Sequence, residues 1–186
     1  MTFLPKGYEK PAGNSNYFKF EEGDNKFRIM SSAIVGFLDW DDKKPVRTKE
    51  KPTTLFNSEK QAKHFWAFIV WDYKESKLKI MEITQATIQD SILGLHNDEG
   101  WGSPTEYDIT ILRKGKDIET KYTVIPKPPT PLTDEMTATL KESNINLNAL
   151  FSGGDPFAKE TPHNNEAQNN KKPHTEDIEV ENIPDF

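Results

Sequence analysis

Alternation of apolar and polar residues predicts the first strands of a β-rich domain. In the segment 27–38 the side chains alternate with a period of two, which is the period of a strand. Gly36 lies inside this run, where a bulge or a tight bend is expected. The segment 64–73 is rich in aromatic and β-branched residues and is apolar on both faces. After a turn at 74–76, the segment 77–83 completes a predicted hairpin.

A helical pattern and a second pair of strands follow. Thr84 is placed to cap a helix over 85–95. The apolar stripe of this helix consists of Ile88, Ile92 and Leu95. Strands are predicted at 106–112 and 119–125, with a turn at 113–117. The order strand, strand, strand, helix, strand, strand is that of the oligonucleotide-binding (OB) fold, a five-stranded Greek-key barrel.

Polar and proline-rich stretches interrupt and end this predicted domain. The segment 39–63 is polar and broken by prolines, so we expect a long loop there. Consecutive prolines at 127–131 should end the last strand, because proline cannot donate to a sheet ladder. A short helix capped by Thr133 should reach residue 141, and a further turn is expected at 147–151.

The chain therefore divides into four predicted parts. They are an irregular N-terminal arm at 1–16, an OB domain at 17–126, a proline-rich linker with a short helical extension at 127–157, and a disordered acidic tail at 158–186. Hydrophobic residues make up 34% of the 186 residues and the mean hydropathy is -0.78, so much of the chain cannot be core. The expected fold class is all-β with one or more short helices, followed by disorder.

The composition of the chain indicates the cellular compartment in which the protein acts. Cysteine is absent, which excludes disulfides and thiolate metal sites and suits a reducing environment. No N-terminal apolar run resembles a signal peptide, and no stretch is long and apolar enough to cross a bilayer. We therefore expect an intracellular protein that does not bind membranes.

The net charge of -6 is unevenly distributed. From Asp155 onward eight carboxylates oppose three lysines, so this part carries -5 and the rest of the chain -1. A nearly neutral body can bind phosphates where its cations are grouped, because fields are screened over about 10 Å. The grouped cations fall on the first loop, the third strand and the last turn, which are the elements that an OB barrel uses for binding. They are Lys43, Lys44, Arg47, Lys49, Lys51, Lys77, Lys79, Arg113, Lys114 and Lys116.

Aromatic side chains supply the second requirement of a single-strand binder, because every base can stack on a ring. Alternation in the second strand sets Trp66 on one face and both Trp71 and Tyr73 on the other, without showing which face points inward. Trp40, beside the basic loop, is a further stacking candidate. We expect Trp71 and Tyr73 to stack with bases if their face points outward. Trp101 is expected to pack within its own loop instead.

The sequence contains few of the motifs expected of an enzyme or a metal-binding protein. No phosphate-cradling glycine loop is present, because Gly153 and Gly154 lack the following Lys-Ser/Thr. The four histidines have no metal-ligand spacing. Asp39, Asp41 and Asp42 lie among lysines and suit a solvated loop better than a metal site. We expect a binding protein with no cofactor and no metal.

Several segments together resemble bacteriophage single-stranded DNA-binding proteins of the OB-fold type. They are 63–73, 80–85, 101–109, 121–126 and 149–157. The C-terminal tail is similar to that of bacterial single-stranded DNA-binding proteins, which end in acidic residues followed by Ile-Pro-Phe. Here Asp185 separates Pro184 from Phe186.

The resemblance implies a protein that coats single-stranded DNA with little sequence preference during phage replication, recombination or repair, in the cytoplasm of the host bacterium. It also implies that Ile183, Pro184, Asp185 and Phe186 recruit replication or recombination proteins. Two other functions fit the same sequence: a phage OB module that holds protein in an assembly, and an RNA-binding OB protein. The oligomeric state is left open.

Overall fold

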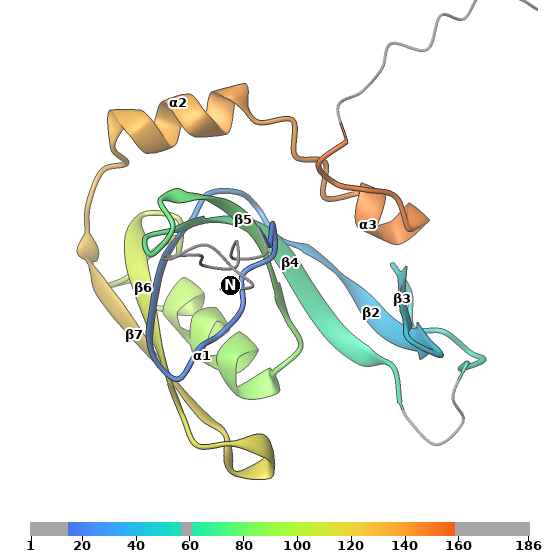
Figure 1. The fold of residues 1–186 in the computed structure, drawn as a ribbon. Coiled ribbons are helices and arrows are strands. Elements are labelled where there is room, and N and C mark those ends of the chain that lie inside the picture. Colours follow the sequence, from blue (N-terminus) through green and yellow to red (C-terminus); the bar gives the residue numbers. More distant parts are fainter. Residues whose placement is uncertain (1–14, 57–60, 159–186) are drawn as a thin grey trace, which may run out of the picture.

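Seven antiparallel strands and a few short helices form the described part of the protein (Figure 1). The structure is a computed structural model that describes residues 15–56 and 61–158. The mostly-β class predicted from the sequence is confirmed, with seven strands where five were expected. They are β1 (Gly23–Ile29), β2 (Ile34–Asp41), β3 (Lys44–Thr48), β4 (Lys63–Asp72), β5 (Lys77–Ile83), β6 (Tyr107–Lys114) and β7 (Lys121–Pro129). Their order in the sheet is β3-β2-β4-β1-β6-β7, and β5 pairs with β4.

The predicted long first strand is two strands, β1 and β2, which both pair with β4. Between them the backbone leaves the ladder, and the Ser31 hydroxyl accepts a hydrogen bond from the amide of Ile69 at 2.9 Å. This break separates the barrel part of the strand from a three-stranded projection made of β2, β3 and residues 63–67 of β4 (Figure 1). β3 lies within the segment expected to be a loop.

Gly36 allows the projection to pack closely. A Cβ atom at this position would lie 2.4 Å from the carbonyl oxygen of Thr48 and 2.9 Å from a ring carbon of Phe151. Neighbouring backbone therefore occupies the space of a side chain, which is the close approach that a glycine inside a strand often marks.

Helix α1 (Ala86–Asn97) packs its buried side against the sheet. Its Ile88 and Ile92 join Phe27, Phe68 and other buried residues in the first core. Gln85, and not the predicted Thr84, is the N-cap residue, and its side chain makes no capping hydrogen bond.

The last strand continues through the prolines that were expected to end it. β7 reaches Pro129, which pairs with Tyr107 of β6. The strand tolerates prolines because it is at the edge of the sheet and the pairing with β6 is irregular between Tyr107 and Ile109, opposite the prolines. The turn before β7 contains the short 3₁₀ helix η1 (Asp117–Glu119).

The helical extension after β7 lies against the body. Thr133 caps α2 (Asp134–Glu142) as predicted, because its hydroxyl accepts a hydrogen bond from the amide of Met136 at 3.2 Å. α3 (Ala149–Ser152) follows and ends at Gly153, which has a positive φ of 70°. The second core joins the extension to the outer face of β4 and β5. It contains Met136, Leu147 and Leu150 from the extension, and Phe65, Ala67, Ile69, Trp71, Leu78 and Ile80 from the strands.

The segment 16–20 lies between β5 and β7. Tyr17 bridges Ile80 of β5, and the amide of Phe18 donates to the Ile80 carbonyl at 2.8 Å. At the other side, the ring of Phe20 packs edge-on against Tyr122 of β7, 5.6 Å away. No ladder joins β5 to β7 among the described residues, so this segment fills the position where an OB barrel would close. A complete OB barrel stays a prediction.

Candidate nucleic-acid interface

One face of the projection carries a row of accessible apolar and aromatic side chains, here called the aromatic face. It consists of Val35, Phe37, His64 and Trp66. Paired residues of neighbouring strands share a face of a sheet, and the register pairs Val35 with Trp66 and Phe37 with His64. The rings of Phe37 and His64 meet edge-on at 5.5 Å. Val35 is 53% exposed and His64 is exposed, whereas Phe37 and Trp66 are half-buried and Trp66 packs against the first core.

Asp39 fixes two further aromatic residues beside the projection. Its buried carboxylate accepts hydrogen bonds from the amide of Trp40 at 2.8 Å and from the amide of Phe56 at 2.9 Å. Trp40 is 46% exposed and Phe56 is 60% exposed. Both rings are therefore accessible for stacking.

Lysines surround the same projection. Lys43 and Lys44 lie at the turn between β2 and β3, where Asp42 has a positive φ of 53°. Lys49, Lys51 and Lys63 are also exposed. Lys49 Nζ lies 5.7 Å from the centroid of the Phe151 ring. Arg47 is placed differently from the prediction, because its guanidinium is half-buried and bonded to the Glu82 carboxylate at 2.6 Å.

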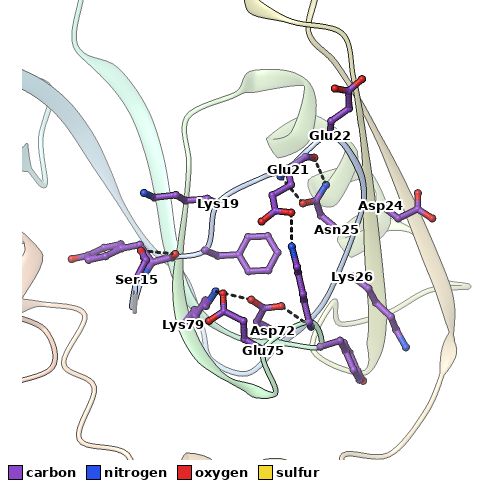
Figure 2. A pocket seen from close by; sticks show the side chains of 14 residues that line it. Ser15, Lys19, Glu21, Glu22, Asp24, Asn25, Lys26, Asp72, Glu75 and Lys79 are labelled. Carbon is purple, nitrogen blue, oxygen red and sulfur yellow. Dashed lines mark hydrogen bonds and ion pairs between the residues drawn. The ribbon is translucent and has the colours of Figure 1, made fainter. Parts of the chain in front are cut away.

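Two predicted contact residues are buried, so the structure corrects their placement. Trp71 is 3% exposed and belongs to the second core, because the helical extension covers its face of β4. Lys79 is 5% exposed, and its ammonium lies 2.7 Å from Asp72 and 2.6 Å from Glu75 (Figure 2). Neither side chain is available to a nucleic acid in this structure.

Ion pairing dominates the electrostatics around Lys79. Burial alone would lower the pKa of Lys79, but its hydrogen bonds to Asp72 and Glu75 outweigh this effect and raise the pKa. The hydrogen bonds that Lys77 and Lys79 donate lower the pKa of Glu75 to about 2. Lys77 lies 2.8 Å from Glu75, so this predicted cation also faces a carboxylate.

The surrounding pocket is a poor phosphate site. It has a volume of about 640 Å³ and lies between the segment 15–26 and the β4–β5 turn. Figure 2 shows carboxylates among its lysines. One of them, Glu21, lies 2.5 Å from Lys74. Since acids offset its cations, a phosphate gains little net attraction there.

Tyr73 is tied into a charged cluster on the barrel wall. Its hydroxyl donates to Asp108 at 2.8 Å, and Lys26 Nζ lies 4.0 Å from the centre of its ring. Burial, together with the bond to Asp108, raises the pKa of Tyr73 to about 12. Asp108 also binds Lys26 at 2.9 Å and Arg28 at 3.1 Å. The half-buried ring of Tyr73 is therefore covered on one side.

The remaining predicted cations lie at the β6–β7 turn. Lys114 and Lys116 are exposed, whereas Arg113 is half-buried and donates to the Phe20 carbonyl at 3.2 Å. In the view of Figure 1, this turn and the projection lie on different sides of α1. Trp40, Trp66, Lys43, Lys44, Lys49 and Lys51 thus lie in or next to the projection, whereas the β6–β7 turn lies apart from it. Alternation along β2 places Trp40 on the face opposite to Val35 and Phe37. The tail residues 183–186 lie outside the described residues.

Sequence reasoning missed Val35, Phe37, Phe56, Lys63 and His64. The alternation placed Val35 and Phe37 on one face of a strand, but only the register with β4 shows their neighbours. Phe56 is the one aromatic residue in the polar segment 39–63 besides Trp40, and this isolation was an available signal.

The fold and surface are those of a small β-domain with accessible rings and lysines on one three-stranded projection. No family model matches the chain, and no solved structure matches it significantly. The chain is 27% identical over 156 residues to a protein of Escherichia phage T5 named "Probable ssDNA-binding protein". The match covers 65% of this chain and 60% of the T5 protein, so the chain spans about three-fifths of that relative. Within the described residues, no helix has the length and apolarity needed to cross a membrane.

Proposed function

We propose that this protein binds single-stranded DNA along the projection, with bases stacked on the aromatic face and phosphates near the surrounding lysines. The observation that carries the proposal is the row formed by Val35, Phe37, His64 and Trp66, which is at least partly exposed on a projection that also bears exposed lysines. Stacking on such rings contributes about 1–3 kcal/mol per base and tolerates any sequence. It requires unpaired bases, which favours single strands over duplexes.

The similarity to the phage T5 protein supports the same function independently of the geometry. We extend it to coating of single strands during phage replication, recombination or repair in the host cytoplasm, by binding and without catalysis. The tail residues Ile183, Pro184, Asp185 and Phe186 are proposed to recruit partner proteins. We also propose that Lys114 and Lys116 form a secondary phosphate-binding site, because both side chains are exposed.

Two substitutions on the aromatic face test the proposal against a buried control. Trp66→Ala should raise the Kd for a fluorescent oligothymidylate by roughly 5- to 150-fold, through loss of one stacking contact. His64→Ala, at an exposed position, should also weaken binding without altering the melting temperature. The control Trp71→Phe changes a ring that the extension covers, so its Kd should equal that of the unsubstituted protein.

Two results would oppose the proposal. Unchanged affinity in both Trp66→Ala and His64→Ala would remove the aromatic face from the binding site. A Trp71→Phe variant that folds normally but binds as poorly as Trp66→Ala would instead place the bound DNA on the face of β4 that α2 and α3 cover. Equal affinity for an RNA oligomer of the same sequence would favour the RNA-binding alternative.

A further inference from the structure

A groove adjoins the aromatic face where the projection meets α1. Its volume is about 310 Å³, and it is walled by four separate parts of the chain: the break after β1, strand β4, helix α1 and the loop 103–105. Apolar side chains form most of the lining, including Trp66, Phe68, Ile92, Leu93 and Pro104. The lining also includes the exposed His96 and the hydroxyl groups of serine and threonine residues.

The groove presents apolar surface to water, and covering that surface with a ligand is favourable. Leu93 on α1 is 44% exposed, whereas the adjacent Ile92 is buried in the first core. Phe68, at 2% exposure, contributes the buried end of the groove. The site is therefore an opening into the edge of the first core.

Trp66 belongs both to the groove and to the aromatic face. His64, Trp66 and Phe68 alternate along β4, so they point to the same side of the sheet. A DNA strand that lies along the projection and stacks on His64 therefore reaches the groove at the next ring, Trp66. This continuity identifies the occupant as part of the same nucleic acid.

We propose that the groove binds a single unstacked nucleobase of the single-stranded DNA held on the projection. This inference rests on the proposed function. A volume of about 310 Å³ is at the lower end of small-ligand sites, which suits one base and not a folded peptide segment. The apolar walls fit the faces of a base, and the hydroxyl and imidazole groups of the lining can bond its polar edge.

The charge of the lining agrees with this occupant. The lining contains no acidic side chain, whereas the pocket shown in Figure 2 contains several. A base can therefore enter while its phosphate stays at the rim without facing a carboxylate. Because a pocket of this kind unstacks one base per bound protein, it would hold the strand in a fixed path at that nucleotide.

Filling the groove tests the inference. Ala33 lines it and is exposed, so Ala33→Phe should occupy the space without entering the core. The matched control is Ala138→Phe, at an exposed position of α2 outside the groove. Ala33→Phe should weaken binding of an oligothymidylate by about tenfold, the size of one lost stacking contact, and the control should bind as the unsubstituted protein does.

The outcomes separate this inference from the function on which it rests. Equal affinity of folded Ala33→Phe and of the control would overturn the groove and leave single-strand binding in place. Failure of the unsubstituted chain to bind any single strand would overturn both. An Ala33→Phe chain that binds an unfolded peptide more weakly, but DNA equally, would assign the groove to protein.

Photocrosslinking of the unsubstituted chain decides the question if Ala33→Phe does not fold. An oligothymidylate carrying one 5-iododeoxyuridine is irradiated with the full chain, and the crosslinked residues are mapped by mass spectrometry. We expect a crosslink at His96, an exposed ring that lines the groove and does not belong to the aromatic face. Crosslinks at Phe37 or Trp66 without any at His96 would show that the bases stop on the aromatic face.

Discussion

Trp71 should stabilise the fold and should not contact DNA, and its truncation to alanine gives the sharpest structural test. The side chain is 3% exposed between β4 and the extension, in contact with a core that includes Met136, Leu147 and Leu150. Truncating a buried tryptophan costs about 3–5 kcal/mol, since the cavity cannot fully collapse. For a domain of this size, that loss lowers the melting temperature by on the order of 10–20 °C.

The assay is thermal unfolding followed by circular dichroism, with Trp40→Ala as the matched control. Trp40 is 46% exposed, so its truncation should change the stability by less than about 0.5 kcal/mol. If Trp71→Ala melts at the same temperature as Trp40→Ala, the extension does not seal the outer face of β4. In that case the face that we regard as covered would again be open to a ligand.

Three further predictions address the projection and the charged cluster. Gly36→Ala should lower the stability by about 1–3 kcal/mol in urea titrations, because its Cβ would lie 2.4 Å from the Thr48 carbonyl oxygen; unchanged stability would contradict that packing. Burial raises the pKa of Asp108, but hydrogen bonds from Lys26, Tyr73 and Arg28 outweigh it and lower the pKa. The stability that Asp108 contributes is therefore present above its unfolded pKa of about 4 and is lost as pH falls through the folded value, so Asp108→Asn should flatten the acid limb of a melting-temperature profile; a profile as steep as the original would oppose this. Tyr73→Phe should destabilise the fold by about 1 kcal/mol while leaving DNA affinity unchanged, and weaker DNA binding by this variant would return Tyr73 to the interface.

The hairpin of β4 and β5 was predictable because local patterns determine it. The residues at 64–83 combine β-branched and aromatic side chains with a short polar turn, and the observed strands agree with the prediction within a residue. The same segment is apolar on both faces, which indicates that both faces are covered. The sequence does not show which distant segment covers the second face, since α2 and α3 come more than fifty residues later.

Other features depended on pairing between distant segments. The alternation at 27–38 continues through the break between β1 and β2, so it gives no sign that a hydroxyl replaces the ladder there. β3 is a short edge strand containing Pro45, and such strands lack a strong alternating pattern. The burial of Lys79 depends on carboxylates supplied by Asp72 and Glu75, and the sequence alone ranked it with the solvent-exposed lysines.

The candidate surface was predicted in part for the same reason. Composition located the lysines of the first loop and the exposed Trp40, because loop residues are rarely buried. The choice between Trp66 and Trp71 required the position of the extension, which is a tertiary property. The edge-on pair of Phe37 and His64 required the register between β2 and β4.

Titration of the full chain with fluorescent single-stranded and double-stranded oligonucleotides, each at low and moderate salt, tests the central claim most directly. The account predicts tight binding of the single strand, much weaker binding of the duplex, and an affinity that falls as salt rises because lysines neutralise phosphates. Intrinsic tryptophan fluorescence should fall on single-strand binding, through stacking at Trp66. Absence of single-strand binding, or binding that prefers the duplex, would contradict the account.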